Sequence, residues 1–328
     1  MKKTFLNRAI AQAVSEEMAR DEKVVLLGED IKHFGGGLSI FMGVPDKYPD
    51  RCLEMPIAEL GFTHFGGGAA AAGMRPVVDL MFSDFMTVAC DSIINFAAKY
   101  RYVTLGEACM PIVYVAGNGS RGLYGGWSSG CNHDQCMENL FVNIPGLKVV
   151  MPYYPDDARG LLKASIRDND PVVFFYQLGS VGLQGMVSED PEDIIPLNNA
   201  AKILEEGTDV TIIAIQGVIP FALEAAAKLK EEGISAKVID PRVISPLDTE
   251  KIFASVKKTG RVVITHEASV RGGIGGEIAA VIQESCHKEL KSPIKRVGQL
   301  HTPGTTGPTE IMMHVNPDKI YNAVKELL

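Results

Sequence analysis

The chain has 328 residues, 46% of them hydrophobic and 22% charged, and its formal net charge is −8. This length predicts two domains, and the negative charge, without any basic cluster, argues against nucleic acid or an anionic membrane surface as a partner. Because no run approaches the roughly 18 apolar residues of a membrane span and the six cysteines show no disulfide framework, we expect a soluble, cytoplasmic protein with reduced thiols.

Strand and helix signals alternate in the first half of the chain. Leu6, Ile10 and Met18 recur at helical spacing and predict an amphipathic first helix. Helical patterns also occupy residues 85–102 and 155–167. This alternation is typical of βαβ units, in which a mostly parallel sheet carries helices on both faces. The apolar runs that predict its buried strands are residues 24–28, 76–82, 112–116, 148–151 and 172–176.

A second α/β series follows a change in composition. Residues 179–196 are rich in Gly, Ser, Asp, Glu and Pro and show little periodicity, which predicts a linker. The later strands are expected at residues 209–215, 236–239, 261–265 and 294–297, and the later helices at 218–232, 248–257, 276–288 and 318–328. The predicted fold class is therefore α/β, with two doubly wound domains. We place the first domain at residues 1–186, the linker at 187–198 and the second domain at 199–328.

Four glycine-rich runs invite interpretation as phosphate-binding loops. None matches G-x-x-x-x-G-K-[S/T], and none is a G-x-G-x-x-G between a strand and a helix with an acidic residue about 20 positions later. We therefore interpret these runs as turns or as places of close packing. They are residues 35–37, 66–68, 125–126 and 272–276.

Cys131, His133 and Cys136 place three soft ligands close together in the sequence. A structural zinc site needs four ligands, and no second pair is nearby, so we do not predict a metal there. His133 is a better candidate for an active-site residue, because it ends a Gly- and Ser-rich loop at residues 117–130, and long loops on a scaffold often carry function. Without further context, a loop histidine is more often an ordinary surface residue.

Glu59 lies between an extended segment and a predicted helix rich in Gly and Ala. A lone carboxylate in that position is ordinarily a helix-start acid that interacts with the helix dipole. The motifs around Glu59 change this interpretation.

Taken in order, these motifs resemble the β subunits of the E1 component of 2-oxo acid dehydrogenases of the pyruvate, branched-chain and acetoin types. No single motif decides the resemblance, but their order and spacing over nearly the whole chain are specific. The motifs are residues 28–30, 56–61, 75–78, 82–85, 97–102, 133–136, 145–150, 166–171, 245–248 and 266–268.

The resemblance implies a pyrimidine-binding domain followed by a transketolase C-terminal domain. In that family the glutamate matching Glu59 hydrogen-bonds N1′ of the aminopyrimidine of thiamine diphosphate. This contact favours the imino tautomer, which removes the thiazolium C2 proton to give the nucleophile. The aromatic residue matching Phe85 stacks on the pyrimidine. Glu29 and Leu60 would belong to the same cofactor site, and His133 matches a loop histidine that contacts substrate or assists acyl transfer to a lipoyl group.

The resemblance also implies a structural site for a monovalent cation, with K⁺ as the candidate. Backbone and carboxylate oxygens would form it. Its residues would be Ile112, Ser165, Ile166, Asp168 and Asp170.

The family's diphosphate and magnesium motif is absent from the sequence. That motif is Gly-Asp-Gly followed by a downstream Asn, and the Gly-Asn-Gly at residues 117–119 lacks the carboxylate that a hard cation prefers. The chain therefore resembles half of an active site. An α-type E1 subunit would hold Mg²⁺ and share the thiamine diphosphate in an α₂β₂ heterotetramer that includes a β–β contact. Its further partners would be a small 2-oxo acid and a lipoyl-bearing acyltransferase.

Three segments depart from the family pattern: residues 117–131, 176–179 and 301–308. The first is longer than expected, contains Trp127, the one tryptophan of the chain, and borders the expected substrate entrance. The acyl substrate and its acceptor therefore stay open. One alternative is a split transketolase-like subunit that transfers two-carbon ketol units, in which Arg121 and His133 could bind a substrate phosphate. Another is a non-catalytic assembly subunit that keeps the fold.

Overall fold

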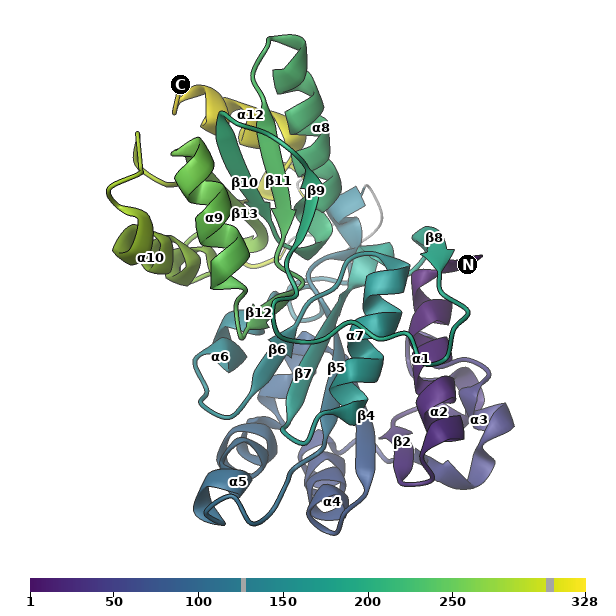
Figure 1. Cartoon of the computed structure of the whole chain (residues 1–328). Helices are drawn as coiled ribbons and strands as arrows, with labels where there is room; N and C mark the ends of the chain where they lie inside the picture. The colour runs from purple at the N-terminus through teal and green to yellow at the C-terminus, as the bar shows by residue number, and fades with distance from the viewer. Residues whose placement is uncertain (125–127, 305–309) are drawn as a thin grey trace.

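The computed structural model describes residues 1–124, 128–304 and 310–328. Two α/β units lie one above the other, each with strands at its centre and helices outside (Figure 1). The predicted fold class is confirmed. The N-terminus lies beside the lower unit and the C-terminus at the far end of the upper one.

The first unit contains a seven-stranded sheet in the order β12-β6-β7-β5-β4-β2-β3. All neighbours are parallel except β12, which runs antiparallel to β6. Every residue of β2, β5 and β7 is buried, as expected for a parallel sheet that is covered on both faces. The strands are β2 (Val24–Gly28), β3 (Cys52–Glu54), β4 (Arg75–Phe82), β5 (Val113–Asn118), β6 (Lys148–Val150), β7 (Val172–Gln177) and β12 (Val243–Ser245).

Two helical layers cover this sheet. Helices α1 (Leu6–Arg20) and α7 (Pro155–Arg167) pack side by side on one face, where their apolar residues share a core with Val24 and Leu26 of β2. The opposite face buries Val25 and Leu27 against α4 (Glu59–Ala71) and its neighbours. Short helices complete the unit: α2 (Ile31–Phe34), α3 (Val44–Lys47), α5 (Ala98–Val103) and α6 (Glu138–Val142).

The single helix predicted at residues 85–102 is wrong in detail. The chain forms a 3₁₀ turn, η2 (Ser83–Thr87), then a π-helical stretch, η3 (Asp91–Ala97), and then α5. A π-helical stretch widens the turn and is common near functional sites. Sequence periodicity does not distinguish it from a continuous α-helix.

The glycines of α4 confirm the interpretation of close packing. A Cβ on Gly67 would lie 2.7 Å from the ring of Phe96, and one on Gly66 would lie 3.0 Å from Val78. The absence of side chains therefore lets α4 approach both η3 and β4. This approach fixes the helix whose first residue is Glu59. The glycine run at residues 125–126 lies outside the described residues.

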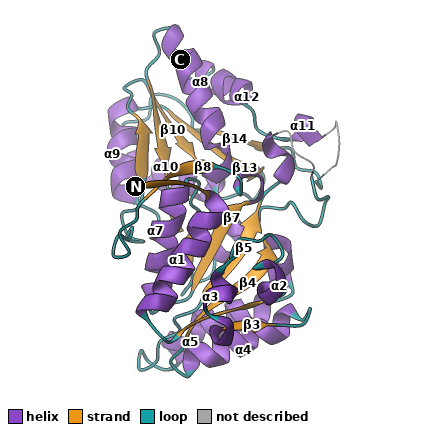
Figure 2. Cartoon of the chain, turned by 90° about the vertical axis from the view of Figure 1, so that its right-hand side faces the viewer, coloured by secondary structure: helices purple, strands orange, loops and turns teal. Residues whose placement is uncertain are grey.

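The second unit has a five-stranded sheet in the order β14-β13-β10-β11-β9, in which only β9 is antiparallel to its neighbour. Helices α8 and α12 cover one face, and α9 and α10 cover the other (Figure 2). The strands are β9 (Lys202–Glu205), β10 (Val210–Ala214), β11 (Ala236–Asp240), β13 (Val262–Ser269) and β14 (Lys295–Gln299). The helices are α8 (Ile219–Glu231), α9 (Thr249–Thr259), α10 (Gly275–Cys286), α11 (Glu310–Met313) and α12 (Pro317–Lys325).

The connection between the units is more ordered than its composition predicts. Strand β8 (Gln184–Val187) lies within the segment 179–196, whose composition predicts a linker, and pairs antiparallel with β1 (Lys2–Phe5). The second unit also contributes β12 to the sheet of the first unit. The boundaries placed at residues 186 and 199 stay a prediction.

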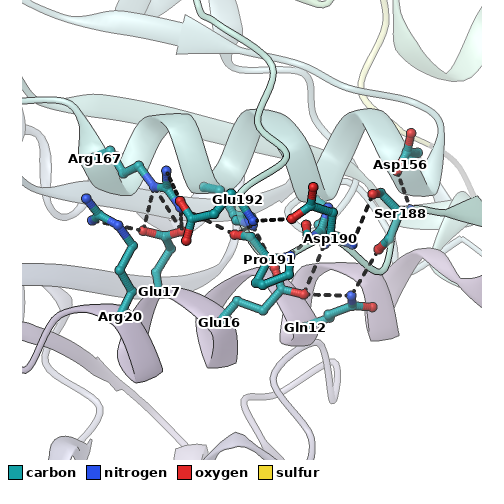
Figure 3. Close-up of polar contacts among 12 residues, drawn as sticks. Gln12, Glu16, Glu17, Arg20, Asp156, Arg167, Ser188, Asp190, Pro191 and Glu192 are labelled. Carbon is teal, nitrogen blue, oxygen red and sulfur yellow. Dashed lines mark hydrogen bonds and ion pairs between the residues drawn. The ribbon is translucent and has the colours of Figure 1, made fainter. Parts of the chain in front are cut away.

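An ion cluster fastens this connection to α1 and α7. Figure 3 shows Glu16 and Glu17 of α1 facing the segment that contains Asp190 and Pro191. Arg159 and Lys163 of α7, both fully buried, each lie 2.7 Å from the carboxylate of Glu16. Both also donate to backbone carbonyls of the connecting segment.

None of the helices in the described part of the chain is long and apolar enough to cross a membrane. The cytoplasmic location stays a prediction.

Candidate active site

The expected site residues lie on segments that follow neighbouring strands of the first sheet. Glu29 directly follows β2, and Glu59 begins the helix that comes after β3. Phe85 follows β4 in the turn η2, and the loop that leads to His133 follows β5. Because these strands are parallel, their carboxyl ends meet at one edge of the sheet. That edge is where open α/β sheets bind their ligands.

Glu59 is partly exposed at the first position of α4. Its backbone carbonyl accepts a hydrogen bond from the hydroxyl of Thr63 at 2.6 Å, which fixes the helix start. The neighbouring apolar side chains point to solvent, with Ile57 85% and Leu60 43% exposed. In this chain alone the start of α4 is an open apolar surface with one carboxylate on it.

Glu29 lies close enough to Glu59 for their charges to interact. Burial, and then the charge of Glu59, raise the pKa of Glu29 to about 7. Its Oε1 atom is buried and has no hydrogen-bond partner among the described residues. A buried acid that is partnerless and titrates near neutrality is a candidate for proton transfer or ligand binding.

Asp79 of β4 is a second acid of this kind, and sequence reasoning missed it. Burial raises the pKa of Asp79 to about 7, a backbone hydrogen bond from Met81 opposes this, and the charge of Glu29 adds to it. Its Oδ2 atom is also buried without a partner in the described part of the chain. One signal was available: Asp79 is an acidic residue inside an otherwise apolar strand.

Phe85 and His133 come together in an aromatic cluster with Phe82. The ring of His133 meets the ring of Phe82 edge to face at 4.9 Å between centroids and that of Phe85 at 5.2 Å. The two phenyl rings are 5.3 Å apart, and the Arg121 guanidinium lies 6.0 Å from the ring centre of Phe82. Nδ1 of His133 lies 3.0 Å from Oδ1 of Asn132. Two of the residues predicted for the site are thus in contact.

The loop end that carries His133 is held to the turn that carries Phe85. The hydroxyl of Ser83 donates to the carbonyl of Gln135 at 2.9 Å, and Nε2 of Gln135 donates to Asp84 at 2.6 Å. Burial raises the pKa of Asp84, while the hydrogen bonds from Gln135 and the nearby His133 oppose that rise. Phe85 and His133 are therefore fixed relative to each other by polar contacts on both sides.

The backbone oxygens expected to hold a monovalent cation already accept hydrogen bonds. Nη1 of Arg75 donates to the carbonyls of Ile166 and Asp168 at 3.0 and 2.9 Å. The carbonyl of Ile112 accepts the amide of Val172 at 2.9 Å. The hydroxyl of Ser165 donates to the helix backbone.

The two carboxylates of the expected cation site also face cations of the protein. Nζ of Lys148 lies 2.6 Å from Asp168, and Nη1 of Arg101 lies 2.7 Å from Asp170. Three basic side chains thus contact the oxygens that a K⁺ ion would need, and this arrangement does not fit a further cation. The cation site stays a prediction that the geometry does not support.

Two cavities of about 770 and 830 Å³ lie away from this edge. Tyr102, Pro145 and Pro246 are among the residues that line the first, and Asn139 and Arg296 among those that line the second. Neither lining includes Glu59, Phe85 or His133. A third cavity, of about 400 Å³, adjoins the loop end that carries His133, and Cys131, Asp134 and Gln135 are among the residues that line it.

Two protein families match the chain. Residues 3–182 match the family described as the transketolase pyrimidine binding domain, and residues 199–320 match the transketolase C-terminal domain. Among solved structures, a split gene transketolase described as an inactive beta4 tetramer is 25% identical, with a TM-score of 0.81 over 99% of this chain and 98% of that chain.

Curated relatives are more similar in sequence. The subunit beta of the acetoin:2,6-dichlorophenolindophenol oxidoreductase of Bacillus subtilis is 41% identical over 98% of this chain and 96% of its own length. The pyruvate dehydrogenase E1 subunit beta-1 of Arabidopsis thaliana mitochondria is 42% identical over 92% of this chain and 83% of its length. The 2-oxoisovalerate dehydrogenase subunit beta of B. subtilis is 41% identical over 97% of both. These three relatives are named for different substrates, although their sequence identities to this chain are nearly equal. Sequence identity therefore does not single out one substrate.

Proposed function

This chain belongs to the transketolase-like family of E1 β subunits of 2-oxo acid dehydrogenases, and from that premise we propose that it supplies the pyrimidine-side half of a thiamine diphosphate site. The reaction is decarboxylation of a 2-oxo acid, followed by acyl transfer to a lipoyl carrier. The observation that carries the proposal is that Glu29, Glu59, Phe85 and His133 all lie on segments that follow neighbouring parallel strands, at one carboxyl edge of the first sheet.

The side chains at this edge fit an aminopyrimidine. The partly exposed carboxyl of Glu59 is free to exchange a proton with a ring nitrogen, and the partnerless oxygen of buried Glu29 is ready to accept a hydrogen bond. The half-buried ring of Phe85 offers a stacking surface. When bound, thiamine diphosphate supplies a nucleophilic carbon for the 2-oxo group and a sink for the electron pair left by CO₂.

Each side chain of the chain then has a distinct task. Glu59 holds or releases a proton at N1′ of the pyrimidine, and this proton movement activates the cofactor. Glu29 sets the charge next to Glu59, because its own pKa lies near neutrality. His133 stands beside Phe85 at the end of the loop, where its imidazole would donate a hydrogen bond to an oxygen of a bound substrate or product.

The proposal includes an α-type partner that supplies the diphosphate and Mg²⁺ half of the site. The sequence lacks Gly-Asp-Gly, and the apolar surface around Ile57 and Leu60 is exposed at the same edge as Glu59. An α₂β₂ assembly would cover this surface and would shield the cofactor from water. The lipoyl acyltransferase would approach from the side of His133.

An assay with the chain and its α partner tests the reaction. Both proteins are combined with Mg²⁺ and thiamine diphosphate, and reduction of 2,6-dichlorophenolindophenol is followed with pyruvate, a branched-chain 2-oxo acid or acetoin. We expect turnover with at least one of the two 2-oxo acids, and none with a ketose phosphate and an aldose phosphate acceptor. Turnover of acetoin alone would contradict the proposed decarboxylation, because acetoin has no carboxylate to lose. Ketol transfer without 2-oxo acid turnover would instead support the split transketolase.

A binding measurement tests the half-site. The isolated chain should bind thiamine diphosphate weakly with or without Mg²⁺, and addition of the α partner should produce tight, magnesium-dependent binding. Tight magnesium-dependent binding by the chain alone would contradict the proposal, because the second half of the site would then be present in this chain.

A further inference from the structure

The loop between β5 and His133 is tied to the second unit by two buried carboxylates. The backbone amide of Ser120 donates to Glu267 of β13, and the hydroxyl of Ser120 donates to Glu310 of α11 at 2.7 Å. Farther along the loop, the amide of Ser128 donates to the other oxygen of Glu310 at 3.3 Å. Glu267 and Glu310 are 5% and 4% exposed, so both are withdrawn from solvent.

Glu267 is part of a closed set of hydrogen bonds. Nε2 of Gln177, at the end of β7, donates both to the carbonyl of Ser120 at 2.8 Å and to Glu267 at 3.2 Å. One side of the loop is thereby fixed to a strand of each unit. The fit is tight, because a Cβ on Gly119, whose φ is +74°, or on Gly122 would overlap the carboxylates of Glu267 and Glu310 respectively.

The held part of the loop is connected directly to the segment of His133. The amide of Gly119 donates to the carbonyl of Gln135 at 3.0 Å. The hydroxyl of Ser128 donates to Asp134, which also accepts the amide of Gly130 at 3.2 Å. The amide of His133 donates to the carbonyl of Gly130 at 3.2 Å, which closes the turn. Movement at Ser120 or Ser128 is therefore transmitted to the imidazole.

We propose that Glu267 and Glu310 are positioning residues, through which the second α/β unit fixes His133 against Phe82 and Phe85. Neither carboxylate belongs to the cofactor edge of the first sheet. Each acts through the loop, because its described loop partners are Ser120 and Ser128. The neighbouring His314 supports Glu310 from the second unit, with Nε2 3.3 Å from its Oε1. The inference rests on the proposed function only for the role of His133.

The kinetic test uses the complete α/β complex with Glu267→Gln and Glu310→Gln. Each amide keeps the shape of the side chain but has only one acceptor oxygen in place of two, so one of the hydrogen bonds that the carboxylate accepts is lost or has to reverse its direction. We expect kcat to fall by about ten- to a hundredfold, as for misplacement of a group in an active site, with the Kd of thiamine diphosphate unchanged. In a His133→Ala background the same substitutions should have no further effect on kcat. Additive losses would overturn the proposal.

Asp240→Asn is the matched control. Asp240 lies on β11 of the same unit, is fully buried, and has no contact with the loop among the described residues. Burial, and then the charge of Asp157, raise its pKa to about 8, and burial likewise raises that of Glu267 to about 8. The control complex should keep its kcat. If it loses as much as Glu267→Gln, the effect comes from general damage to the second unit and the proposal fails.

A spectroscopic measurement on the full chain separates this inference from the proposed function. Trp127 is the one tryptophan and lies in the sequence between Ser120 and Ser128. Glu310→Gln and Ser120→Ala should each change its emission and increase its quenching by acrylamide, whereas Asp240→Asn should not. If a glutamate variant does not fold, Ser120→Ala replaces it in this test. Unchanged emission in folded variants would overturn the positioning role of Glu267 and Glu310 even if the enzyme is active. Changed emission without 2-oxo acid turnover would support that role and refute the proposed function.

Discussion

Two groups of acids in the first unit lie in opposite environments. On α1, Glu16 faces buried Arg159 and Lys163, and Glu17 receives a bidentate contact from Arg167 at 2.7 to 3.0 Å. At the carboxyl edge of the sheet, Glu29 and Asp79 are also buried, but each has an oxygen without a partner among the described groups. Burial raises the pKa of both edge acids to about 7.

This difference in hydrogen-bond and ion-pair partners separates acids that stabilise the fold from acids that are available for catalysis or ligand binding. Removing a charge from water is costly, and a buried carboxylate is tolerated when cations and donors surround it. The cluster on α1 meets that condition and fastens the connecting segment. The acids at the edge do not meet it within this chain, and such positions are where ligands, protons or partner subunits complete an environment. We therefore expect substitutions in the first group to reduce stability and substitutions at the edge to reduce activity.

The largest expected effect is that of Glu59→Gln. The amide cannot exchange a proton with the cofactor, and acid–base contributions of this kind are worth about 10²-fold or more in rate. Because the side chain is partly exposed, the free energy of unfolding should change by less than about 0.5 kcal/mol. The turnover rate of the reconstituted α/β complex and a urea titration of the chain measure the two quantities.

A complex that keeps full activity with Glu59→Gln would refute a catalytic role and favour the non-catalytic assembly subunit. A large decrease in the free energy of unfolding would also contradict the distinction between the two groups of acids, because Glu59 would then behave like the acids on α1.

The next effect is on stability. Glu16→Ala leaves Arg159 and Lys163, which are 1% and 0% exposed, without their shared carboxylate. Breaking a buried ion pair from one side costs about 3–5 kcal/mol of unfolding free energy. Urea denaturation measures this loss, and kcat of the folded complex should stay near the wild-type value. Glu192→Gln, a change at a 71% exposed partner of Arg167, is the control and should cost under about 1 kcal/mol.

The comparison also explains what the sequence could and could not predict. Apolar runs in the sequence predict strands β2, β4, β5, β6 and β7, and apolar periodicity predicts helices such as α1 and α7. The parallel order of the strands brings Glu29, Glu59 and Phe85 to one edge. Their roles stay predictions. Strands β1, β3, β8, β9 and β12 were missed because each has only three or four residues and lies at the edge of its sheet.

The carboxylates that hold the loop were beyond local reasoning. Glu267 is separated from Ser120 by 147 positions and Glu310 by 190, so only the packing of the two units brings them together. The partnerless oxygens of Glu29 and Asp79 are equally invisible to periodicity, since a lack of partners is a property of the whole fold.

Glu29→Gln should have a smaller effect on activity than Glu59→Gln and a distinct dependence on pH. The folded-state pKa of about 7 exceeds the ordinary value of 4.5, so Glu29 contributes stability at low pH that is lost as the pH rises through about 7. The amide does not ionise, so the variant should be less sensitive to pH between about 5 and 8. We expect a rate loss of about tenfold. In the plot of kcat/KM against pH, the inflection near pH 7 that comes from Glu29 should disappear. A profile that superimposes on the wild type would exclude Glu29 from the site.

The smallest effect is expected for Asp240→Asn, an acid that is buried and partly unpaired but far from the edge. Burial, and then the charge of Asp157, raise its pKa from 3.8 to about 8, while a backbone hydrogen bond from Arg242 opposes the rise. Because the folded state holds this proton more tightly than the unfolded state, the wild-type chain loses stability as the pH rises from about 4 to about 8, and the amide should reduce this loss by about 1–3 kcal/mol. Urea titrations at pH 5.5 and 8.5 measure the difference. An unchanged slope would mean that Asp240 is ionised in the fold. Unchanged activity would show that a buried oxygen without a partner does not by itself mark the active edge, whereas a loss of activity would contradict the comparison between the two groups of acids.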